Sequence, residues 1–340
     1  MNRVPGSGFG VWGARIGKRS VILAVALALP ALLSVELAVR ARLYLNSGLC
    51  FKEEGLFQYR PHTQVGDRPE RTTNNLGFFG TDLSHPKNPG TYRVFLLGAS
   101  TIASPLTPTL IHEKLAALVP EASVEVNSTG VPRYTSHHLR LLFEHELLPL
   151  QPDCILVYLG LNDNVYDTHP HLSGEPPSGV FDHADPWRSI AWDALRYYTL
   201  GKRKGVTPDF TGTRSQEVFE ANLRHILQLT QTHGVRAALV KMAVGYPTDD
   251  PFLVAAIRNA EGPMQHYWGT LDAALSALSG QWAACDRLGA EFAVPVGDPS
   301  PVLPKTHEYF ADLGHFTPTG HERFAAYAAD LIKDCMRRAP

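Results

Sequence analysis

A regular alternation of short apolar runs and longer amphipathic segments constrains the fold of this chain more than any other feature. It starts at Tyr92 and continues to the carboxyl terminus. Short apolar runs are typical of strands buried on both faces of a parallel sheet, and amphipathic segments of about ten or more residues are typical of the covering helices. The order predicts an α/β fold with a mostly parallel, about five-stranded sheet between two helical layers.

The expected elements follow from these patterns. Strands are predicted at residues 92–97, 123–126, 154–159, 236–244 and 291–295. Helices are predicted at 109–119, 136–148, 216–232 and 318–336, with helical segments through 252–288. A short helix-like piece at 187–198 stands inside an otherwise irregular insertion, of the kind that often forms lids or binding loops.

Composition and short motifs exclude several classes of protein. The 340 residues are 44% hydrophobic and 19% charged, which is typical of a globular protein with a sizeable core. The formal net charge of −2 leaves no basic footprint of the kind that nucleic-acid binding requires. The four cysteines never stand at Cys-x-x-Cys spacing, which argues against a zinc or redox site. A dinucleotide fingerprint and a phosphate-binding loop are both missing, so nucleotide binding has no support.

The amino terminus carries a membrane or export signal. Arg15, Lys18 and Arg19 precede an apolar segment at 21–35, and no convincing small-x-small cleavage site follows it. We expect an uncleaved anchor, with the folded domain facing outward, which in a bacterium is the periplasmic side of the inner membrane. The alternative is secretion after signal cleavage. The predicted units are a basic segment at 1–19, a transmembrane or signal-anchor helix at 20–42, a loop-rich lead-in at 43–90, and a domain at 91–340 with an irregular insertion at 164–215.

Polar residues follow three of the predicted strands. Ser100 comes shortly after the first strand, Gly130 follows the second, and Asn162 follows the third. In open α/β sheets the chemistry lies at the carboxyl ends of the strands, so Ser100 is well placed to be a nucleophile. A serine nucleophile needs donors aimed at the developing oxyanion. The Asn162 amide and the backbone N–H groups of Ser100 and Gly130 can supply them.

A base for the serine is expected close to the carboxyl terminus. Asp312 and His315 are three residues apart, just before the helix start at Thr317-Pro318. In a turn this spacing lets the carboxylate accept a hydrogen bond from one imidazole nitrogen, which leaves the other nitrogen free to take the serine proton.

These blocks resemble the SGNH hydrolase family, also called GDSL-type esterases and lipases. The resemblance covers Tyr92 to the carboxyl terminus, and 74–80 resembles a segment that precedes the serine block in membrane-anchored bacterial members. It implies a flavodoxin-like three-layer α/β/α sandwich that needs no metal or organic cofactor. The implied site is Ser100 as nucleophile, Gly130 and Asn162 with the Ser100 amide as the oxyanion hole, His315 as general base and acid, and Asp312 as its orienting carboxylate.

Two positions depart from the family pattern. Ala99 replaces the aspartate of the Gly-Asp-Ser form, and Arg133 stands where many relatives have a small residue. The first changes the neighbourhood of the nucleophile but removes no member of the triad, and the second can alter the pocket.

Several residues also have a simpler structural interpretation. Ser100 alone could be a helix-capping turn residue, and His321 is a rival to His315 as the base. Thr101, Asp163 and Asn75 are candidate supporting residues, although Asp163 and Asn75 also suit ordinary turns. His137 and His138 start a helix and are expected to face solvent or the strand ends; no further ligands at suitable spacing favour a metal there.

The function hypothesis is hydrolysis of an ester-linked acyl group, on a carbohydrate O-acetyl ester or a small acyl ester. Two alternatives stay open: an O-acyltransferase acting on cell-envelope polysaccharide, and a catalytically inactive, membrane-anchored binding or assembly protein. The expected partners are the ester substrate and the membrane, with no nucleic acid. Acyl chain length, protein partners, the disulfide state and the oligomeric state are not readable from the sequence.

Overall fold

A six-stranded sheet, in the order β3-β5-β4-β6-β7-β8, forms the centre of the molecule. The computed structural model describes residues 26–28, 30–38, 41, 49–51, 57–65, 71–168 and 213–337. Five neighbouring strands run parallel, and β3 pairs antiparallel with β5 at one edge. The strands are β3 (Phe79–Gly80), β4 (Thr91–Gly98), β5 (Ser123–Ser128), β6 (Cys154–Leu159), β7 (Arg236–Lys241) and β8 (Val296–Gly297).

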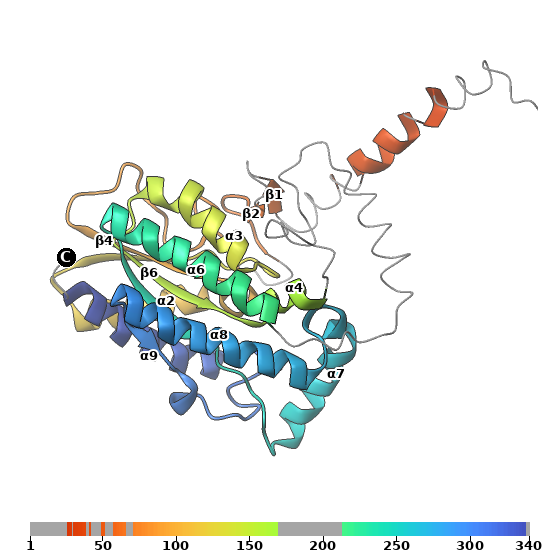
Figure 1. The fold of residues 1–340 in the computed structure, drawn as a ribbon. Coiled ribbons are helices and arrows are strands. Elements are labelled where there is room, and N and C mark those ends of the chain that lie inside the picture. The colour runs from red at the N-terminus through yellow and green to blue at the C-terminus, as the bar shows by residue number, and fades with distance from the viewer. Residues whose placement is uncertain are drawn as a thin grey trace, which may run out of the picture.

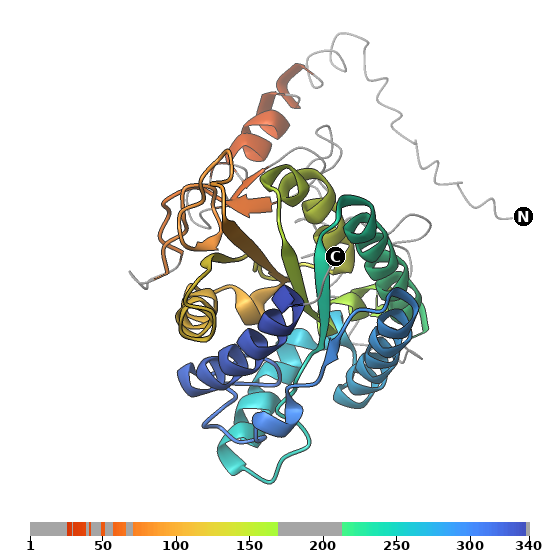
Figure 2. The ribbon, with the colours of Figure 1, turned by 90° about the vertical axis from the view of Figure 1, so that its left-hand side faces the viewer.

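Helices cover both faces of this sheet, which confirms the predicted three-layer α/β/α arrangement (Figures 1 and 2). One layer holds α2 (Leu106–Leu118) and α9 (Pro318–Arg337), whose apolar faces share a core with Val94 and Leu96. The other layer holds α3 (Ser136–Leu141), α6 (Thr213–His233) and the carboxyl half of α8 (Leu271–Phe292). Their core includes the alternate β4 residues Phe95 and Leu97. Because successive side chains point to opposite faces of a strand, β4 contributes residues to both cores.

Two strand predictions need correction. The strand expected at 291–295 is wrong, because α8 continues through Phe292 and ends with Ala293 in the left-handed conformation, at φ 55°. Only Val296–Gly297 pairs with β7. The short edge strand β3 lies in the segment that we expected to be all loop, and a two-residue strand is too short to leave a periodic signal.

Two helix predictions also change. The helical region expected at 252–288 is two helices, α7 (Pro251–Trp268) and α8, separated by Gly269 at φ +78°. The helix expected at 136–148 is α-helical only to Leu141 and continues as a π-helical turn (Leu142–Leu147) and a 3₁₀ turn (Leu148–Leu150). Glycine with positive φ commonly ends a helix, which explains the break after α7.

The strand order reverses between β4 and β6. After β4, the chain adds β5 on one side of it and then returns to place β6 on the other side, with Gly98 opposite Tyr158. In open α/β sheets such a reversal leaves a crevice at the carboxyl ends of the two strands. The residues that follow β4 and β6, including Ser100 and Asn162, therefore meet at this point.

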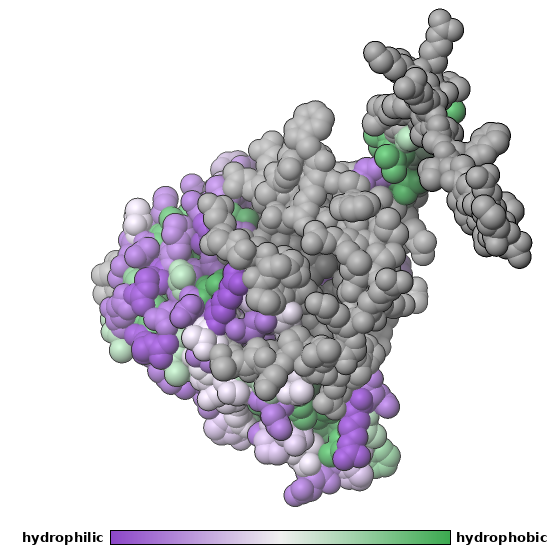
Figure 3. Space-filling view, turned by 45° about the vertical axis from the view of Figure 1, so that its right-hand side comes forward, coloured by the Kyte–Doolittle hydropathy of each residue, from purple (hydrophilic) through white to green (hydrophobic). Residues whose placement is uncertain are grey.

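The amino-terminal region is only partly described. Residues 26–28 and 30–38 are helical, and their exposed apolar side chains include Leu32 (66% exposed) and Leu33 (59%). In Figure 3 these hydrophobic residues stand apart from the body of the molecule, at the upper right. Within the described residues, no helix combines the length and the hydropathy that a membrane span requires.

Other predictions about the chain ends and the insertion fall mostly outside the described residues. This holds for 1–19, for much of 20–42, and for 169–212 of the predicted insertion. Within the lead-in, β1 (Leu49–Phe51) and β2 (Phe57–Tyr59) form a small antiparallel hairpin.

Candidate active site

A tight turn after β4 presents the Ser100 side chain. A Cβ at Gly98 would lie 2.5 Å from the Tyr158 carbonyl oxygen, so the close pairing of β4 with β6 requires glycine there. Ser100–Ile102 then form a 3₁₀ turn, and the Ser128 hydroxyl donates to the Ile102 carbonyl at 2.7 Å. The turn is thus fastened to the end of β5, and Ser100 is held at the carboxyl edge of the sheet.

A short loop before α9 positions Asp312 and His315. An antiparallel bridge joins Phe310 and Phe316, and the Ala311 N–H donates to the His315 carbonyl at 2.8 Å. One oxygen of Asp312 accepts the backbone N–H groups of both Gly314 and His315, each at 2.9 Å. The carboxylate therefore builds the loop that carries the histidine.

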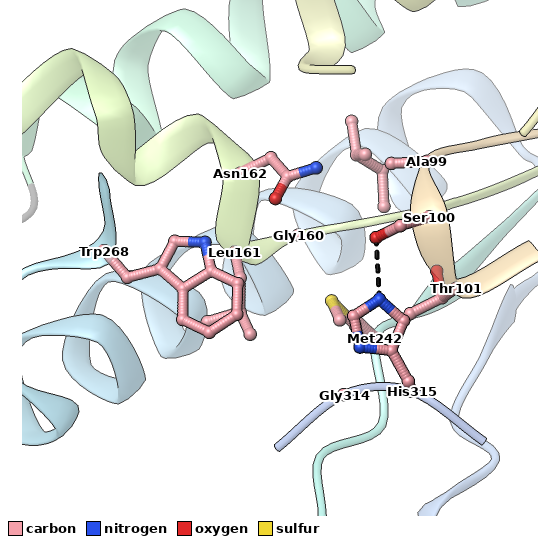
Figure 4. Close-up of a pocket in the computed structure, with 11 residues that line it drawn as sticks. Ala99, Ser100, Thr101, Gly160, Leu161, Asn162, Met242, Trp268, Gly314 and His315 are labelled. Atoms are coloured by element: carbon pink, nitrogen blue, oxygen red, sulfur yellow. Dashed lines mark hydrogen bonds between the residues drawn. The ribbon is translucent and has the colours of Figure 1, made fainter. Parts of the chain in front are cut away.

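Ser100, His315 and Asp312 form a chain of hydrogen bonds, and Figure 4 shows the bond between Ser100 and His315. The Ser100 Oγ is 2.9 Å from His315 Nε2, and His315 Nδ1 is 2.7 Å from Asp312 Oδ2. Partial burial alone would lower the pKa of His315, but the hydrogen bond that its Nδ1–H donates to the Asp312 carboxylate, together with the charge of that carboxylate, outweighs burial and raises the pKa above 6.5. Burial would raise the pKa of Asp312, and the same pairing with His315 lowers it. The arrangement suits a serine whose proton passes to histidine.

Asn162 lies across the cavity from the serine turn, on the 3₁₀ turn Leu161–Asn164 that follows β6. Its Nδ2 donates to the Tyr134 carbonyl at 3.0 Å. A side-chain amide has two N–H groups, so one remains for a ligand in the cavity.

Gly130 has a different environment from the one expected of an oxyanion donor. Its N–H donates to the Ser128 hydroxyl at 3.3 Å, and Gly130 is not among the residues that line the cavity. A Cβ at this position would lie 2.5 Å from the Ala103 backbone nitrogen. Close packing of two backbone segments, rather than an exposed N–H, accounts for glycine here.

The three candidate supporting residues have separate roles. Thr101 lines the cavity beside Ser100. Asp163 is fully buried and accepts hydrogen bonds from the backbone N–H and the hydroxyl of Ser136, at the start of α3. Burial raises the pKa of Asp163 to about 7, although the hydrogen bonds from Ser136 act in the opposite direction. Asn75 is bonded to Leu83 and Asp82 and braces the loop before β4, so the plain turn interpretation suits it better.

Three other histidines named in the sequence analysis lie outside the Ser100–His315–Asp312 line. His321, the rival base, has its Nδ1 2.7 Å from the Thr107 hydroxyl on α2, and burial lowers its pKa to about 4. His137 and His138 were expected to face solvent or the strand ends, and the first of these alternatives is wrong, because both side chains are buried. Burial, aided by the charge of Arg140, lowers the pKa of His137 to about 4. His138 Nδ1 lies 2.9 Å from the Thr135 hydroxyl in a capping box.

One of the two departures from the expected pattern has a physical account. Ala99 is buried in the same apolar cluster as Phe95 and Leu97, where an aspartate would be desolvated. Arg133 has φ 69°, in the left-handed region that favours glycine, and nothing in the described part of the structure explains an arginine at this position.

A small, largely apolar cavity opens beside Ser100 (Figure 4). It is lined by Ala99, Ser100, Thr101, Leu159, Gly160, Leu161, Asn162, Met242, Trp268, Gly314 and His315. The sequence patterns indicated the polar members but missed Met242 and Trp268, which reach the site from the end of β7 and from α7. The only indication in the sequence was the position of Met242, which comes directly after a buried strand.

No metal centre is evident in the described part of the chain, where no group of three or more His, Cys, Asp or Glu side chains could hold a metal ion.

The sequence matches no model of a known protein family and no curated protein sequence. Solved structures that are similar to this chain include a lipase/acylhydrolase from Enterococcus faecalis, at 16% identity and a TM-score of 0.42, covering 72% of this chain and 96% of that one. A GDSL-like lipase from Bacteroides thetaiotaomicron is 15% identical at a TM-score of 0.43, covering 71% and 88%. A catalytic mutant of an acetylxylan esterase from Geobacillus stearothermophilus is 13% identical at 0.44, covering 71% and 94%. These likenesses are too distant to decide a function.

Proposed function

We propose that this chain is a serine hydrolase of SGNH type that cleaves an ester-linked acyl group. The observation that carries the proposal is the hydrogen-bonded line from Ser100 Oγ through His315 to Asp312. A serine is a weak nucleophile until an adjacent base can take its proton, and the carboxylate fixes the tautomer in which His315 Nε2 can accept.

In the first half of the reaction Ser100 Oγ attacks the carbonyl carbon of the ester and its proton passes to His315 Nε2. The bond to the alcohol then breaks, and the same nitrogen returns the proton to the leaving oxygen. The product is an acyl-enzyme on Ser100. In the second half His315 takes a proton from water as the water oxygen attacks the acyl carbon; the bond to Ser100 Oγ then breaks, His315 returns the proton to this oxygen, and the carboxylic acid leaves.

The oxyanion of each tetrahedral intermediate needs donors at the cavity. The Ser100 backbone N–H and the second N–H of Asn162 are the proposed donors, and the bond from Asn162 to the Tyr134 carbonyl holds the amide in place. Gly130 is left out of this oxyanion hole because its N–H is bonded to Ser128.

The proposed substrate is a carbohydrate O-acetyl ester or another ester of a short acyl chain. A cavity lined mainly by Leu161, Met242 and Trp268 can surround a small apolar group next to the serine. Acetate release from acetylated polysaccharides, measured beside hydrolysis of p-nitrophenyl acetate, tests this choice of substrate.

A fluorophosphonate probe tests the reaction class. We expect it to label Ser100 in the folded protein, and we expect Ser100→Ala to lose labelling and at least about 10³-fold in kcat, because the nucleophile is gone. Ser104→Ala is the matched control, since this serine lies in the same region but its hydroxyl only accepts the Leu106 N–H. Full turnover by Ser100→Ala would overturn the proposal. Folded wild-type protein that takes up no probe would instead favour the inactive binding protein.

The amino-terminal segment is proposed to anchor the enzyme in a bacterial inner membrane, with the hydrolase domain on the periplasmic side. Its support is the apolar run at 21–35 behind three basic residues, and the exposed leucines of the helix at 30–38. Exposed apolar surface of this kind is costly in water.

A further inference from the structure

Trp268 forms the wall of the cavity that lies opposite the nucleophile. Figure 4 shows the indole ring across the cavity from Ser100, next to Leu161, with Asn162 above the space between them and Met242 beside His315. The side chains of Ser100, His315 and Asn162 supply most of the polar groups, whereas Trp268 presents ring carbons and a single nitrogen. A substituent that points away from the serine must therefore meet this ring.

The surrounding fold holds this ring firmly. Trp268 is the last residue of α7, and Gly269 at φ +78° ends the helix there. Thr270 then caps α8, with its hydroxyl accepting the Ala273 N–H at 3.2 Å. The indole also packs against Val165 and Tyr166 of α4 (Val165–Thr168). Because the Trp268 ring is held at a helix junction and against buried side chains, a larger ligand does not displace it easily.

The reaction geometry decides which part of an ester meets Trp268. In the tetrahedral intermediate the carbon carries Ser100 Oγ, the oxyanion, the leaving oxygen and the acyl chain. The oxyanion must point to its donors at Asn162, and the leaving oxygen must lie near His315 Nε2 to be protonated. Figure 4 places these two groups on different sides of Ser100 Oγ. The acyl chain is bound by neither group, so we place it in the rest of the cavity, where Trp268 forms the far wall.

We propose that Trp268 determines acyl-chain length by closing the acyl side of the cavity to all but short chains. The inference rests on the proposed ester hydrolysis, and it assigns to this one side chain the preference for acetyl and propionyl over hexanoyl and octanoyl groups. Removal of the ring extends the cavity toward α4, and a longer chain can then occupy the space.

A series of p-nitrophenyl esters from acetyl to octanoyl tests the proposal, because the leaving group stays constant. For the wild type we expect kcat/KM to fall with chain length beyond propionyl. For Trp268→Ala we expect a larger ratio of kcat/KM for the hexanoyl ester to kcat/KM for the acetyl ester. The rise should be at least about tenfold, because the longer chain gains room in the transition state. Trp268→Phe keeps an aromatic wall of smaller size and is expected to fall between the two, and it serves where the alanine variant fails to fold.

Two controls make the result specific. Phe252→Ala removes an aromatic ring from the other end of the same helix, where the side chain is 70% exposed, and is expected to keep the wild-type profile. A second series, of acetyl esters with different alcohols, is expected to respond equally in the wild type and in Trp268→Ala. An unchanged acyl profile with an altered alcohol profile would show that the ring contacts the leaving group, and would overturn the proposal. Absence of all hydrolysis and of probe labelling in the wild type would instead overturn the proposed function itself.

Discussion

Asp312 sets both the position and the basicity of His315. It binds the loop N–H groups through one oxygen, and it holds the imidazole by hydrogen bonding and by charge. The pKa of His315 is raised by this pairing, although partial burial acts against it. Because only the neutral imidazole can take the Ser100 proton, activity must rise with pH through this raised pKa.

We therefore predict that Asp312→Asn moves the acidic limb of the pH profile of kcat/KM to lower pH. Without the negative charge, burial is left to lower the pKa of His315, so the histidine stays neutral in more acidic solution. The maximum rate should also fall by about 10²- to 10⁴-fold, because an amide at this position no longer enforces the required tautomer. Steady-state kinetics from pH 5 to pH 9 measure both effects. A limb that keeps its position would show that Asp312 does not control His315.

Single residues differ in how far the sequence predicts them. Asp312 and His315 could be paired because a spacing of three fixes their distance in any tight turn, and the structure places their atoms in contact. The role expected for Gly130 depends on where a backbone N–H points, which no residue type specifies. Trp268 reaches the cavity from α7, and a contact between distant elements leaves no local pattern.

The 3₁₀ turn Leu161–Asn164 is fixed by hydrogen bonds to α3, to the segment just before it and to α8. Asn162 donates to the carbonyl before α3, Asp163 binds the start of α3, and Asn164 lies between α8 residues, accepting from Gln281 at 3.2 Å. Asn222 of α6 also donates to the Ser136 hydroxyl at 3.0 Å. The orientation of the proposed oxyanion donor therefore depends on a buried polar network.

We predict that Asp163→Asn becomes more stable relative to the wild type as pH rises. Burial raises the pKa of folded Asp163 to about 7, against an ordinary value of 3.8, so the folded state binds the proton more strongly than the unfolded chain. The part of the wild-type free energy of unfolding that depends on this proton is lost as pH rises through 7. The asparagine variant has no such proton, so its free energy of unfolding does not fall for this reason. Urea unfolding at pH 5 and pH 7.5 should show the advantage of the variant growing by about 1 kcal/mol or more.

Asp286→Asn is the matched control for this measurement. Its carboxylate is 57% exposed and pairs with Lys241 at the surface, in contrast to the buried Asp163. Equal pH dependence in wild type and Asp163→Asn would contradict the assignment of a raised pKa to the buried carboxylate.

Elements were predictable where they were long and periodic. The four strands β4, β5, β6 and β7 and the helix α9 begin within about two residues of their predicted starts. The edge strand β3 and the short β8 were not predictable in position, because two paired residues depend on the neighbouring strand rather than on their own sequence. The break between α7 and α8 had a local signal in Gly269-Thr270.

At the scale of the whole molecule, the anchor proposal predicts where the protein is found. The full-length chain should remain in the bacterial membrane pellet after carbonate extraction, and mass spectrometry should find its amino-terminal segment intact. Leu32→Lys combined with Leu33→Lys should release it, because each lysine at the centre of a membrane helix costs about 3 kcal/mol. Leu118→Lys places the same charge at an exposed leucine of α2 and should leave the protein in the pellet. A soluble, shortened wild-type chain would favour secretion after cleavage.

The overall topology explains why scattered blocks of sequence form one site. Parallel strands all end at the same edge, and the reversal between β4 and β6 brings the residues after these two strands together. The sequence order of strands and helices predicts a parallel sheet, and so it predicts that Ser100 and Asn162 lie at one edge. The depth and width of the cavity depend on packing between helices, which only the structure describes.

The nucleophile and its base are 215 positions apart in the chain, and the base is held by a loop that leads directly into α9. During synthesis, the strands β4 to β8 are complete before His315 and α9 emerge. A growing chain can therefore assemble most of its sheet while Ser100 still lacks a base. Catalytic competence is therefore expected to arrive only after the loop that carries His315 and the helix α9 have been made.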